Sequence, residues 1–551
     1  MNNPLQKIDY ACWIFFGGAI FILWQMLLPG YVLNLDMIFT PSLKVMIGEG
    51  AFINSLPLQL LLHSMNWLLP GWLIQKFILV TLFFCLGYLP YKYLELPDRH
   101  QLKYWGGLFY VINPFVYERF LAGHWMHLFA YSFMPLIIYY LKKTFNNFSA
   151  RYFYLLVIFI WLTGIFSLQF LAIDLIIILF FLSFKMFCLI AEKKIKELKF
   201  NFMSVFFLIV ALVLLNSFWL LPYLDNQSAS VINSFSVEHW QAFKTATDQR
   251  VGLLINVLGL YGFWGEHEPW SENFLWAKSN FNFWLFSLSL VLIVVLTGMI
   301  RSFRQKKKDF WLIAAMFAGF VFSCGLADSL FILINSWLFN EVPFWSGFRD
   351  TNKFSAILAL GYAYFGALGV GFILEMAGKK IKNLKFISTL LFLIPLFLAY
   401  PMLGGFSGQI KSVWFPPSWQ HANDFLDRDK ENFKILFLPW HGYMTFEFAD
   451  NLLIANPAKY FFNKPVIQSE NIELAQAKSL GEKTKKLDEL ISNQAASDKI
   501  MKELATANIK YIIVSENLEG WDSYDYRFLE ESNLLKRYEE AELTIYELVL
   551  K

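Results

Sequence analysis

Long runs of apolar residues recur along the chain up to residue 402, and shorter polar segments separate them. Many of these runs approach the ~20 residues that an α-helix needs to cross the hydrocarbon core of a bilayer. We therefore expect about 11 membrane-spanning helices. They are expected at residues 11–29, 75–91, 104–117, 128–141, 152–166, 170–190, 202–222, 281–300, 310–325, 354–376 and 386–402.

The pattern is interrupted at two places that change the expected topology. The apolar run over 151–190 is too long for one span and contains Ser167-Leu168-Gln169 near its middle, so we expect a tight helical hairpin. The stretch over 53–74 is apolar but is broken by Pro57, by Pro70 and by polar side chains between them. It is expected to form helices that lie in the interface and do not cross the bilayer.

Composition supports a membrane class of protein. The sequence of 551 residues is 57% hydrophobic and 19% aromatic, with 60 Phe. No soluble domain needs so much apolar surface, so the chain is predicted to be a polytopic α-helical membrane protein. All four cysteines lie within apolar runs, which argues against a disulfide framework or a thiolate metal site. The first apolar run follows Lys7 and has no small-residue cleavage site, so we expect a retained first span.

The basic residues predict the orientation of the chain. With the N-terminus in the cytoplasm, the short inner loops carry well over twice as many Lys and Arg residues as the long outer loops. The outer loops are then 30–74, 118–127, 223–280 and 326–353, and an odd number of spans places residues after 402 outside. We expect a multi-pass protein of the plasma membrane whose functional face is extracytoplasmic.

The sequence after residue 402 changes to the composition of a soluble domain. Strands are expected at Lys434–Pro439, Ile509–Val514 and Leu543–Leu550, and helices at Ser418–Leu426, Leu474–Glu489 and Ser497–Ala507. The sequence therefore predicts two domains, a transmembrane domain over 1–402 and a small extracytoplasmic α/β domain over 403–551. The charged stretch over 481–486 is typical of a solvated helix face, and no nucleic-acid partner is expected.

Four ionisable side chains lie between two apolar runs, in the segment over 113–127. They are Glu118, Arg119, His124 and His127. Bilayer hydrocarbon tolerates such groups where they reach the interface, pair with each other or line a wet cavity. The segment is either an interfacial hairpin with snorkelling side chains or one wall of a site for an anionic head group.

The first outer loop supplies a candidate base, Asp36. A partly desolvated carboxylate at the interface can take a proton from a hydroxyl group, because desolvation raises its pKa. The alternative is a helix cap or a charge that only fixes topology.

Three outer cations lie closest to the ends of predicted spans: Arg119, Arg349 and Lys353. Arg presents a planar fork that matches two phosphate oxygens, and Lys presents a point charge. These residues are therefore candidates for binding a lipid phosphate. The alternative is an internal ion pair with Asp350, combined with snorkelling.

Other polar residues are candidates for supporting roles. His124 and His127 are three residues apart and, with Glu118, could hold a divalent metal ion, although packing in an aromatic belt explains them equally well. Asp174 lies about one helical turn beyond Gln169, and an intramembrane carboxylate indicates function or a hydrogen bond to a neighbouring helix.

The largest outer loop mixes aromatic and acidic residues over 261–270. Trp264, Glu266 and His267 are the residues expected to contact an acceptor, because rings stack on sugars and carboxylates bind their hydroxyl groups. Interfacial anchoring by tryptophan is the alternative.

Together these features resemble the GT-C superfamily of polyprenyl-phosphate-sugar-dependent membrane glycosyltransferases. The chain is most similar to arabinofuranosyltransferase-like and YfhO-like multispan proteins, over most of its length. The features are Asp36 in the first outer loop with interfacial helices after it, Asn113-Pro114-Phe115 followed by Glu118-Arg119 and Gly123-His124, Asn216–Pro222, Phe348-Arg349 with Lys353-Phe354, and the outer C-terminal domain. The acid that usually pairs with the first-loop Asp is not evident, since Met37 and Ile38 follow Asp36.

The resemblance implies transfer of a sugar from a polyprenyl-phosphate-linked donor to a glycan or glycoconjugate acceptor at the outer leaflet. Asp36 would act as the base, and the cations would hold the departing lipid phosphate. No cofactor beyond a possible divalent metal ion is implied. Two other classes of protein fit the same topology, a transporter or flippase for lipid-linked sugars and a non-catalytic envelope scaffold.

Overall fold

The computed structural model describes residues 10–46, 53–97, 99–225, 237–305, 309–327, 329–378, 384–469, 482–516, 518, 526–531 and 534–549. The chain forms two compact units. The first unit contains residues 1–24, 51–58 and 77–409, and the second contains residues 25–50, 59–76 and 410–551. Two early segments of the chain thus group with the C-terminal part, whereas the sequence predicts a continuous division near residue 402.

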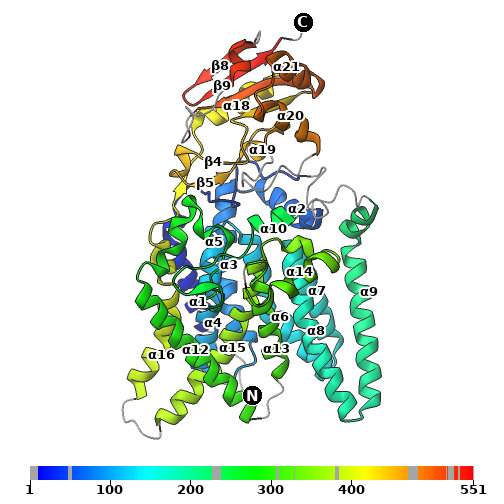
Figure 1. Cartoon of the computed structure of the whole chain (residues 1–551), viewed down its shortest axis with the longest axis vertical. Helices are drawn as coiled ribbons and strands as arrows, with labels where there is room; N and C mark the ends of the chain where they lie inside the picture. The colour runs from blue at the N-terminus through cyan, green and yellow to red at the C-terminus, as the bar shows by residue number, and fades with distance from the viewer. Residues whose placement is uncertain are drawn as a thin grey trace, which may run out of the picture. The chain divides into compact units, whose positions relative to one another are not determined.

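The first unit is a helical bundle (Figure 1). Its longest helices lie side by side, with contacts between α6 and α7, α7 and α8, α8 and α9, and α15 with α12, α13 and α4. Two helices, α2 and α3, are divided between the two units. With these two, the helices of the first unit are α1 (Tyr10–Leu23), α2 (Leu56–Asn66), α3 (Gly71–Tyr93), α4 (His100–Val111), α5 (Pro114–Leu121), α6 (Trp125–Asn146), α7 (Ala150–Phe166), α8 (Leu168–Ala191), α9 (Ile195–Asp225), α10 (Val237–Ala242), α11 (Gly252–Leu258), α12 (Phe281–Arg304), α13 (Phe310–Ser323), α14 (Ile332–Glu341), α15 (Ser355–Gly378), α16 (Leu384–Leu398) and α17 (Leu403–Phe406).

Helix α15 forms the centre of the bundle, and 89% of an apolar 18-residue stretch within the candidate span Thr351–Gly378 is buried. Small residues allow α12 and α15 to approach closely. A Cβ atom added at Gly298 would lie 1.8 Å from the carbonyl oxygen of Phe365, and one at Gly369 would lie 1.9 Å from that of Val294. This is the packing by small residues that is typical of helices in membranes.

Each predicted span overlaps a helix, but the expected count of about 11 spans is not confirmed. By length and composition, six helices in the described part of the chain can cross a membrane, or seven if one bent pair forms a single span. Helix α4 has only 12 residues, or ~18 Å at 1.5 Å per residue, against a hydrocarbon core of ~30 Å. The predicted hairpin is present, since α7 ends at Phe166 and Ser167 caps α8 by accepting a hydrogen bond from the amide of Phe170 at 3.1 Å.

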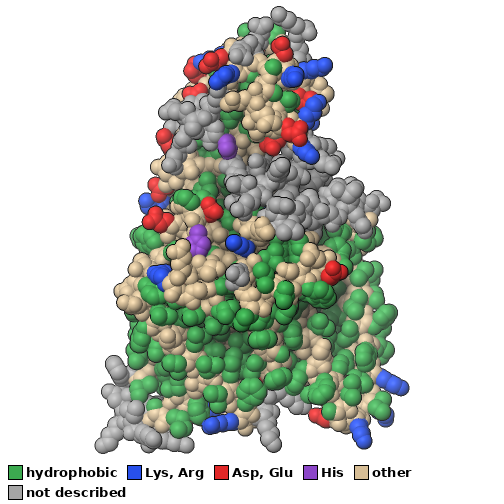
Figure 2. Space-filling model, viewed as in Figure 1, with side chains coloured by type: hydrophobic (Ala, Val, Ile, Leu, Met, Phe, Trp, Pro, Cys, Tyr) green, Lys and Arg blue, Asp and Glu red, His purple; other side chains and the backbone are tan. Residues whose placement is uncertain are grey.

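The surface of the first unit is suited to lipid. Figure 2 shows hydrophobic side chains over most of the visible face of its helices. Large apolar side chains on α8, α9, α12 and α13 are exposed, including Phe187 at 69%, Leu214 at 67% and Phe317 at 62%. An exposed apolar belt on long helices indicates contact with hydrocarbon.

The second unit contains a five-stranded sheet in the order β6-β3-β7-β9-β8. Strand β3 pairs in parallel with β6 and β7, whereas β9 pairs antiparallel with β7 and β8. Leu436, Ile512 and Leu504 are buried in a core between the sheet and its helices. The elements are β3 (Lys434–Leu438), β6 (Val466–Ile467), β7 (Ile509–Ser515), β8 (Leu534–Glu540), β9 (Leu543–Leu548), α18 (Pro417–Arg428), α19 (Ala458–Phe461), α20 (Glu482–Ser492), α21 (Ser497–Thr506) and α22 (Arg527–Glu531).

The small C-terminal sheet domain was predicted, and its three expected strands are β3, β7 and β9. The sequence did not reveal β8, because its residues are mostly charged and its outer position in the sheet requires no apolar alternation. The expected helix over 474–489 is found from Glu482 onward, and its earlier residues lie outside the described part of the chain.

Most of the first outer loop belongs to the second unit, which contains residues 25–50 and 59–76. Strand β1 (Tyr31–Val32) pairs antiparallel with β2 (Ser412–Val413). The side-chain amide of Gln75 accepts a hydrogen bond from the amide of Val32 and donates one to its carbonyl, at 2.8 and 2.7 Å. A second short ribbon, β4 (Tyr443–Thr445) with β5 (Leu453–Ala455), lies beside the next turn of the loop.

Candidate functional site

Asp36 lies at the tip of a tight turn held against β5. The amide of Leu35 donates to the carbonyl of Leu453 at 3.0 Å, and the amide of Ala455 donates to the carbonyl of Leu35 at 2.9 Å. Leu35 has φ of 43°, a left-handed conformation that costs a branched side chain free energy. Leu35 and Met37, the two neighbours of Asp36 in the sequence, are buried, whereas Asp36 itself is exposed. The turn therefore places one carboxylate outside an otherwise buried segment.

A tyrosine from the C-terminal part of the chain holds this carboxylate. The hydroxyl of Tyr443, on β4, donates to Oδ1 of Asp36 at 2.7 Å. This contact joins residues 407 positions apart in the sequence, and both belong to the second unit. Such a hydrogen bond fixes the orientation of a carboxylate and stabilises its charged form.

Arg119 lies in the first unit on the short helix α5. Asn113 caps this helix by accepting a hydrogen bond from the amide of Val116 at 3.1 Å, and Pro114 occupies its first turn, where proline is favoured. The predicted span over 104–117 is consequently broken into α4 and α5 at Asn113. All eight residues of α5 are buried, including the charged pair Glu118 and Arg119.

Arg119 forms an internal ion pair with Asp350. Its guanidinium group contacts both carboxylate oxygens of Asp350, and its second terminal nitrogen donates to the side-chain oxygen of Asn352 at 2.6 Å. The side chain of Arg119 is 0% exposed and that of Asp350 is 5% exposed. Lys353 lies 3.5 Å from the same carboxylate. For Arg119 and Lys353, the alternative of internal pairing is thus the arrangement in the structure.

The charges around Asp350 determine its ionisation. Burial by itself would raise the pKa of its carboxyl group, but the neighbouring charges of Arg119 and Lys353 lower that pKa well below the ordinary range. Asp350 therefore remains ionised and neutralises part of the positive charge.

Arg349 is the most accessible of the three predicted phosphate-binding cations. It is partly exposed, and its guanidinium group lies over the ring of Phe243 at 4.2 Å. The same ring packs edge-on against Trp264, with centroids 4.7 Å apart. Arginine and two aromatic rings in contact form a surface that suits a phosphorylated or glycosylated ligand.

The other two residues expected to contact an acceptor differ in exposure. His267 is exposed and its Nε2 lies 2.9 Å from the carbonyl of Thr247. Glu266 is 3% exposed and accepts hydrogen bonds from the amide of Gly262 and the side chain of Asn256. In this conformation the carboxylate of Glu266 supports the loop.

Glu118 belongs to the same buried network as Glu266. Burial and the neighbouring Glu266 raise the pKa of Glu118 well above its usual range. The amide of Phe263 donates to one of its carboxyl oxygens at 3.4 Å, and the other oxygen is buried without a hydrogen-bond partner in the described part of the chain. Lys278 lies 3.9 Å from Glu266. Glu118 is therefore a group that readily holds a proton.

The predicted metal-binding set is not assembled. The rings of His124 and His127 lie 5.0 Å apart, and His124 contacts Arg119 at 3.5 Å. Glu118 interacts with Glu266. Among the described residues, no group of three or more His, Cys, Asp or Glu side chains could hold a metal ion.

Gln169 and Asp174 lie on α8. Gln169 donates to the carbonyl of Gly347 at 2.7 Å and so holds the segment before Arg349. Asp174 is 1% exposed, and one of its oxygens has no hydrogen-bond partner within the residues described. The supporting role expected for both residues stays a prediction.

Sequence reasoning missed three residues that complete these groups: Tyr443 at Asp36, Asn352 at Arg119, and Phe243 at Arg349. Asn352 lies in the segment over 348–354, where five consecutive polar residues precede the predicted span over 354–376. Tyr443 and Phe243 gave no local signal, because their partners are distant in the sequence.

Comparison with known proteins defines the fold. No family model matches the sequence, and no curated protein sequence matches it. Among solved structures, the chain is similar to arabinofuranosyltransferase AftD from Mycobacteria, with a TM-score of 0.65 and 12% identity, over 98% of this chain and 40% of AftD. A mutant form of AftD gives a TM-score of 0.60 at 11% identity, over 97% of this chain and 41% of that one.

A fainter likeness connects the chain to the archaeal oligosaccharyltransferase AglB from Archaeoglobus fulgidus. Its TM-score of 0.49 and 10% identity are too low to establish a shared fold. The chain spans about 40% of the length of AftD, so the likeness concerns one part of that larger protein. At this level of identity the likeness shows the fold alone, and the chain has the GT-C-like fold that its sequence predicts.

Proposed function

We propose that the protein is a membrane glycosyltransferase that moves a sugar from a polyprenyl-phosphate-linked donor to a glycan acceptor on the outer face of the membrane. The observation that carries this proposal is the exposed carboxylate of Asp36 on a strained, otherwise buried turn. Strained backbone persists where the surrounding structure enforces it, and it is concentrated at functional sites. The GT-C-like fold supports the same reaction class.

The proposed reaction requires one base and one group that stabilises the leaving phosphate. Asp36 takes the proton of the acceptor hydroxyl while the oxygen of that hydroxyl forms a bond to the anomeric carbon of the donor sugar. The bond between that carbon and the phosphate oxygen breaks, and the phosphate leaves on its lipid. Tyr443 keeps the carboxylate in one orientation throughout.

We assign the phosphate contact first to Arg349. Arg119 is fully buried and paired, whereas Arg349 is partly exposed and held in place by Phe243. Because the Arg119–Asp350 pair is buried, we assign it a structural role. Acceptor contacts are assigned to the partly exposed Trp264 and the exposed His267.

Replacing Arg349 with Ala should weaken the binding of farnesyl phosphate, a short polyprenyl monophosphate. A charge-assisted contact contributes about 1.5–3 kcal/mol, so the affinity should fall by roughly 10- to 100-fold in a titration of the purified protein.

Arg250→Ala is a matched control for this experiment. Arg250 is also an outer-loop arginine that lies over an aromatic ring, at 4.1 Å from Phe281, and it forms an ion pair with Asp248. Equal loss of affinity in both variants would contradict a specific phosphate contact at Arg349.

The proposed sidedness is tested by reporter fusions along the chain. Fusions near residues 195, 305 and 382 should report a cytoplasmic location, and fusions near 250 and 480 an extracytoplasmic one, because basic loops remain in the cytoplasm. The activities of a periplasmic and a cytoplasmic reporter, fused at the same positions, give the measurement. A cytoplasmic signal at residue 480 would remove the proposal of transfer at the outer face.

A further inference from the structure

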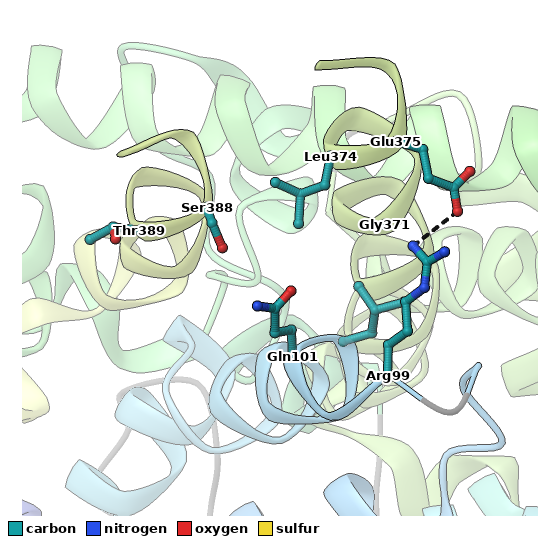
Figure 3. Close-up of a pocket in the computed structure, with 8 residues that line it drawn as sticks. Arg99, Gln101, Gly371, Leu374, Glu375, Ser388 and Thr389 are labelled. Carbon is teal, nitrogen blue, oxygen red and sulfur yellow. Dashed lines mark ion pairs between the residues drawn. The ribbon is translucent and has the colours of Figure 1, made fainter. Parts of the chain in front are cut away.

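A cavity of about 600 Å³ lies in the first unit, away from the groups described above. It opens between the N-terminal end of α4, the C-terminal end of α15 and helix α16 (Figure 3). Its polar lining consists of Arg99, Gln101, Glu375, Ser388 and Thr389. This volume lies within the range of ~300–1,000 Å³ that is typical of sites for small molecules.

The charged side of the cavity carries an excess of positive charge. Arg301 forms a bidentate pair with Glu375 at 2.6 and 3.1 Å, and Arg99 reaches the same carboxylate at 3.0 Å. Two guanidinium groups therefore share one carboxylate. The side chain of Arg99 is 55% exposed, so it has donors directed away from that carboxylate. The group as a whole attracts an anion.

The opposite side of the cavity combines neutral polar and apolar groups. Figure 3 shows the side chains of Gln101 and Ser388 extending toward one another across the cavity, one from α4 and the other from α16. Leu102 and Leu374 complete the wall. An occupant must therefore present a negative charge, groups that form hydrogen bonds, and an apolar portion.

The location of the cavity indicates a lipid as the occupant. It lies among the ends of helices of an apolar bundle, and α15 is one of the candidate spans. The sequence between α15 and α16 contains Lys379, Lys380 and Lys382 and no acidic residue, and Lys385 follows in the first turn of α16. This excess of basic residues predicts the cytoplasmic side. Basic pockets between membrane helices on this side are suited to anionic lipid head groups.

We propose that this cavity binds the head group of an anionic phospholipid of the inner leaflet. The phosphate lies at Arg99, the hydroxyl groups of the head group contact Gln101 and Ser388, and the apolar wall receives the start of an acyl chain. Glu375 limits the affinity, because it neutralises much of the charge on Arg99 and Arg301. This inference is independent of the proposed transferase activity.

The experiment measures lipid binding to the purified full-length protein by native mass spectrometry. The probes are dioctanoyl phosphatidylglycerol, dioctanoyl phosphatidylcholine and glycerol 3-phosphate. Phosphatidylglycerol should bind about tenfold more tightly than phosphatidylcholine. Both lipids carry the phosphate, but the choline group places a positive charge near Arg99 and Arg301 and lacks the hydroxyl groups that Gln101 and Ser388 would contact. Glycerol 3-phosphate, which lacks the apolar portion, should bind more weakly than either lipid.

Four variants distinguish the proposed site from other binding. Arg99→Gln should weaken phosphatidylglycerol binding about tenfold, and Ser388→Leu should weaken it by filling the cavity without changing the charge. Glu375→Gln should strengthen the binding, because it releases both arginines. Arg151→Gln, an exposed arginine outside the cavity at the start of α7, is the matched control and should leave binding unchanged.

Three results would overturn the assignment. The first is equal affinity for the two lipids, and the second is an equal effect of Arg99→Gln and Arg151→Gln. The third is an affinity for glycerol 3-phosphate equal to that for phosphatidylglycerol, which would identify a soluble phosphate ester as the ligand. If Arg99→Gln folds poorly, Ser388→Leu still provides the test. The melting temperature of Ser388→Leu without lipid, compared with that of the wild type, shows whether this variant is folded.

Discussion

Asp36→Asn is expected to reduce sugar transfer by about 10²–10⁴-fold while donor binding and folding are preserved. The amide keeps the shape of the side chain and can still accept the hydrogen bond from Tyr443, but it cannot take a proton. The measurement compares envelope glycans, by mass spectrometry, in cells that lack the protein and carry either the wild type or the variant. This comparison also identifies the acceptor.

Controls separate catalysis from a structural role of the turn. Asp424→Asn makes the same change at an exposed aspartate elsewhere in the second unit and should restore the glycan fully. Asp36→Glu should keep part of the activity if the longer carboxylate still reaches. A structural cap predicts instead that Asp36→Ala lowers the free energy of unfolding by about 0.5–2 kcal/mol and that transfer survives. Full restoration by Asp36→Asn would exclude a catalytic base.

The same experiment defines the role of Tyr443. Tyr443→Phe removes only the hydroxyl that donates to Asp36. If Tyr443 positions the base, the variant should lower kcat and still retain activity well above that of Asp36→Asn, because the carboxylate is present but no longer fixed in one orientation. A structural contact alone would change stability and leave kcat of the folded protein unchanged.

The helices were predictable because their determinants are local. Apolar runs gave the positions of the helices, and Ser167-Leu168-Gln169 gave the break between α7 and α8, where Ser167 is the cap. Whether a helix crosses the membrane is not a local property. Helix α4 is apolar enough to resemble a span but is too short, and the chain turns at Asn113 into α5. The expected count of about 11 spans is therefore not confirmed, because it included helices that are apolar but short.

The grouping of distant segments was not predictable from the sequence. The turn at Asp36 is bound to β5 through Leu35 and Leu453, and no local pattern indicates that the first outer loop groups with the C-terminal part of the chain. Asp36 could be selected as a candidate because a partly desolvated carboxylate at the interface can act as a base, and because the GT-C resemblance includes an acid in the first outer loop. Tyr443 could not, since its role depends on a contact over 407 positions.

The exposure of the three predicted cations also could not be predicted from the sequence. Arg119, Arg349 and Lys353 have the same proximity to span ends, which made them equivalent candidates. The structure buries Arg119 and Lys353 around Asp350 and leaves Arg349 partly exposed. Burial depends on how α5 and the segment before α15 pack, which is a property of the whole bundle.

Arg119→Met is expected to lower the free energy of unfolding by about 3–5 kcal/mol. The substitution removes the guanidinium group that contacts Asp350 and leaves a buried carboxylate with less compensation, although Lys353 remains 3.5 Å from it. Both members of the pair are nearly inaccessible to water, so solvent does not screen the lost interaction. Chemical unfolding in detergent micelles, followed by tryptophan fluorescence, gives the measurement.

Two comparisons decide whether the pair is structural or a phosphate clamp. Arg250→Met removes an arginine that is 44% exposed and whose partner Asp248 also contacts Lys278, so it should cost only ~0–1 kcal/mol. Arg119→Met combined with Asp350→Asn should recover part of the loss, because the uncompensated charge is gone. A clamp that holds lipid phosphate through Arg119 predicts the reverse: stability is kept and farnesyl phosphate binding is lost. A double variant that is more stable than Arg119→Met alone would therefore support the structural role.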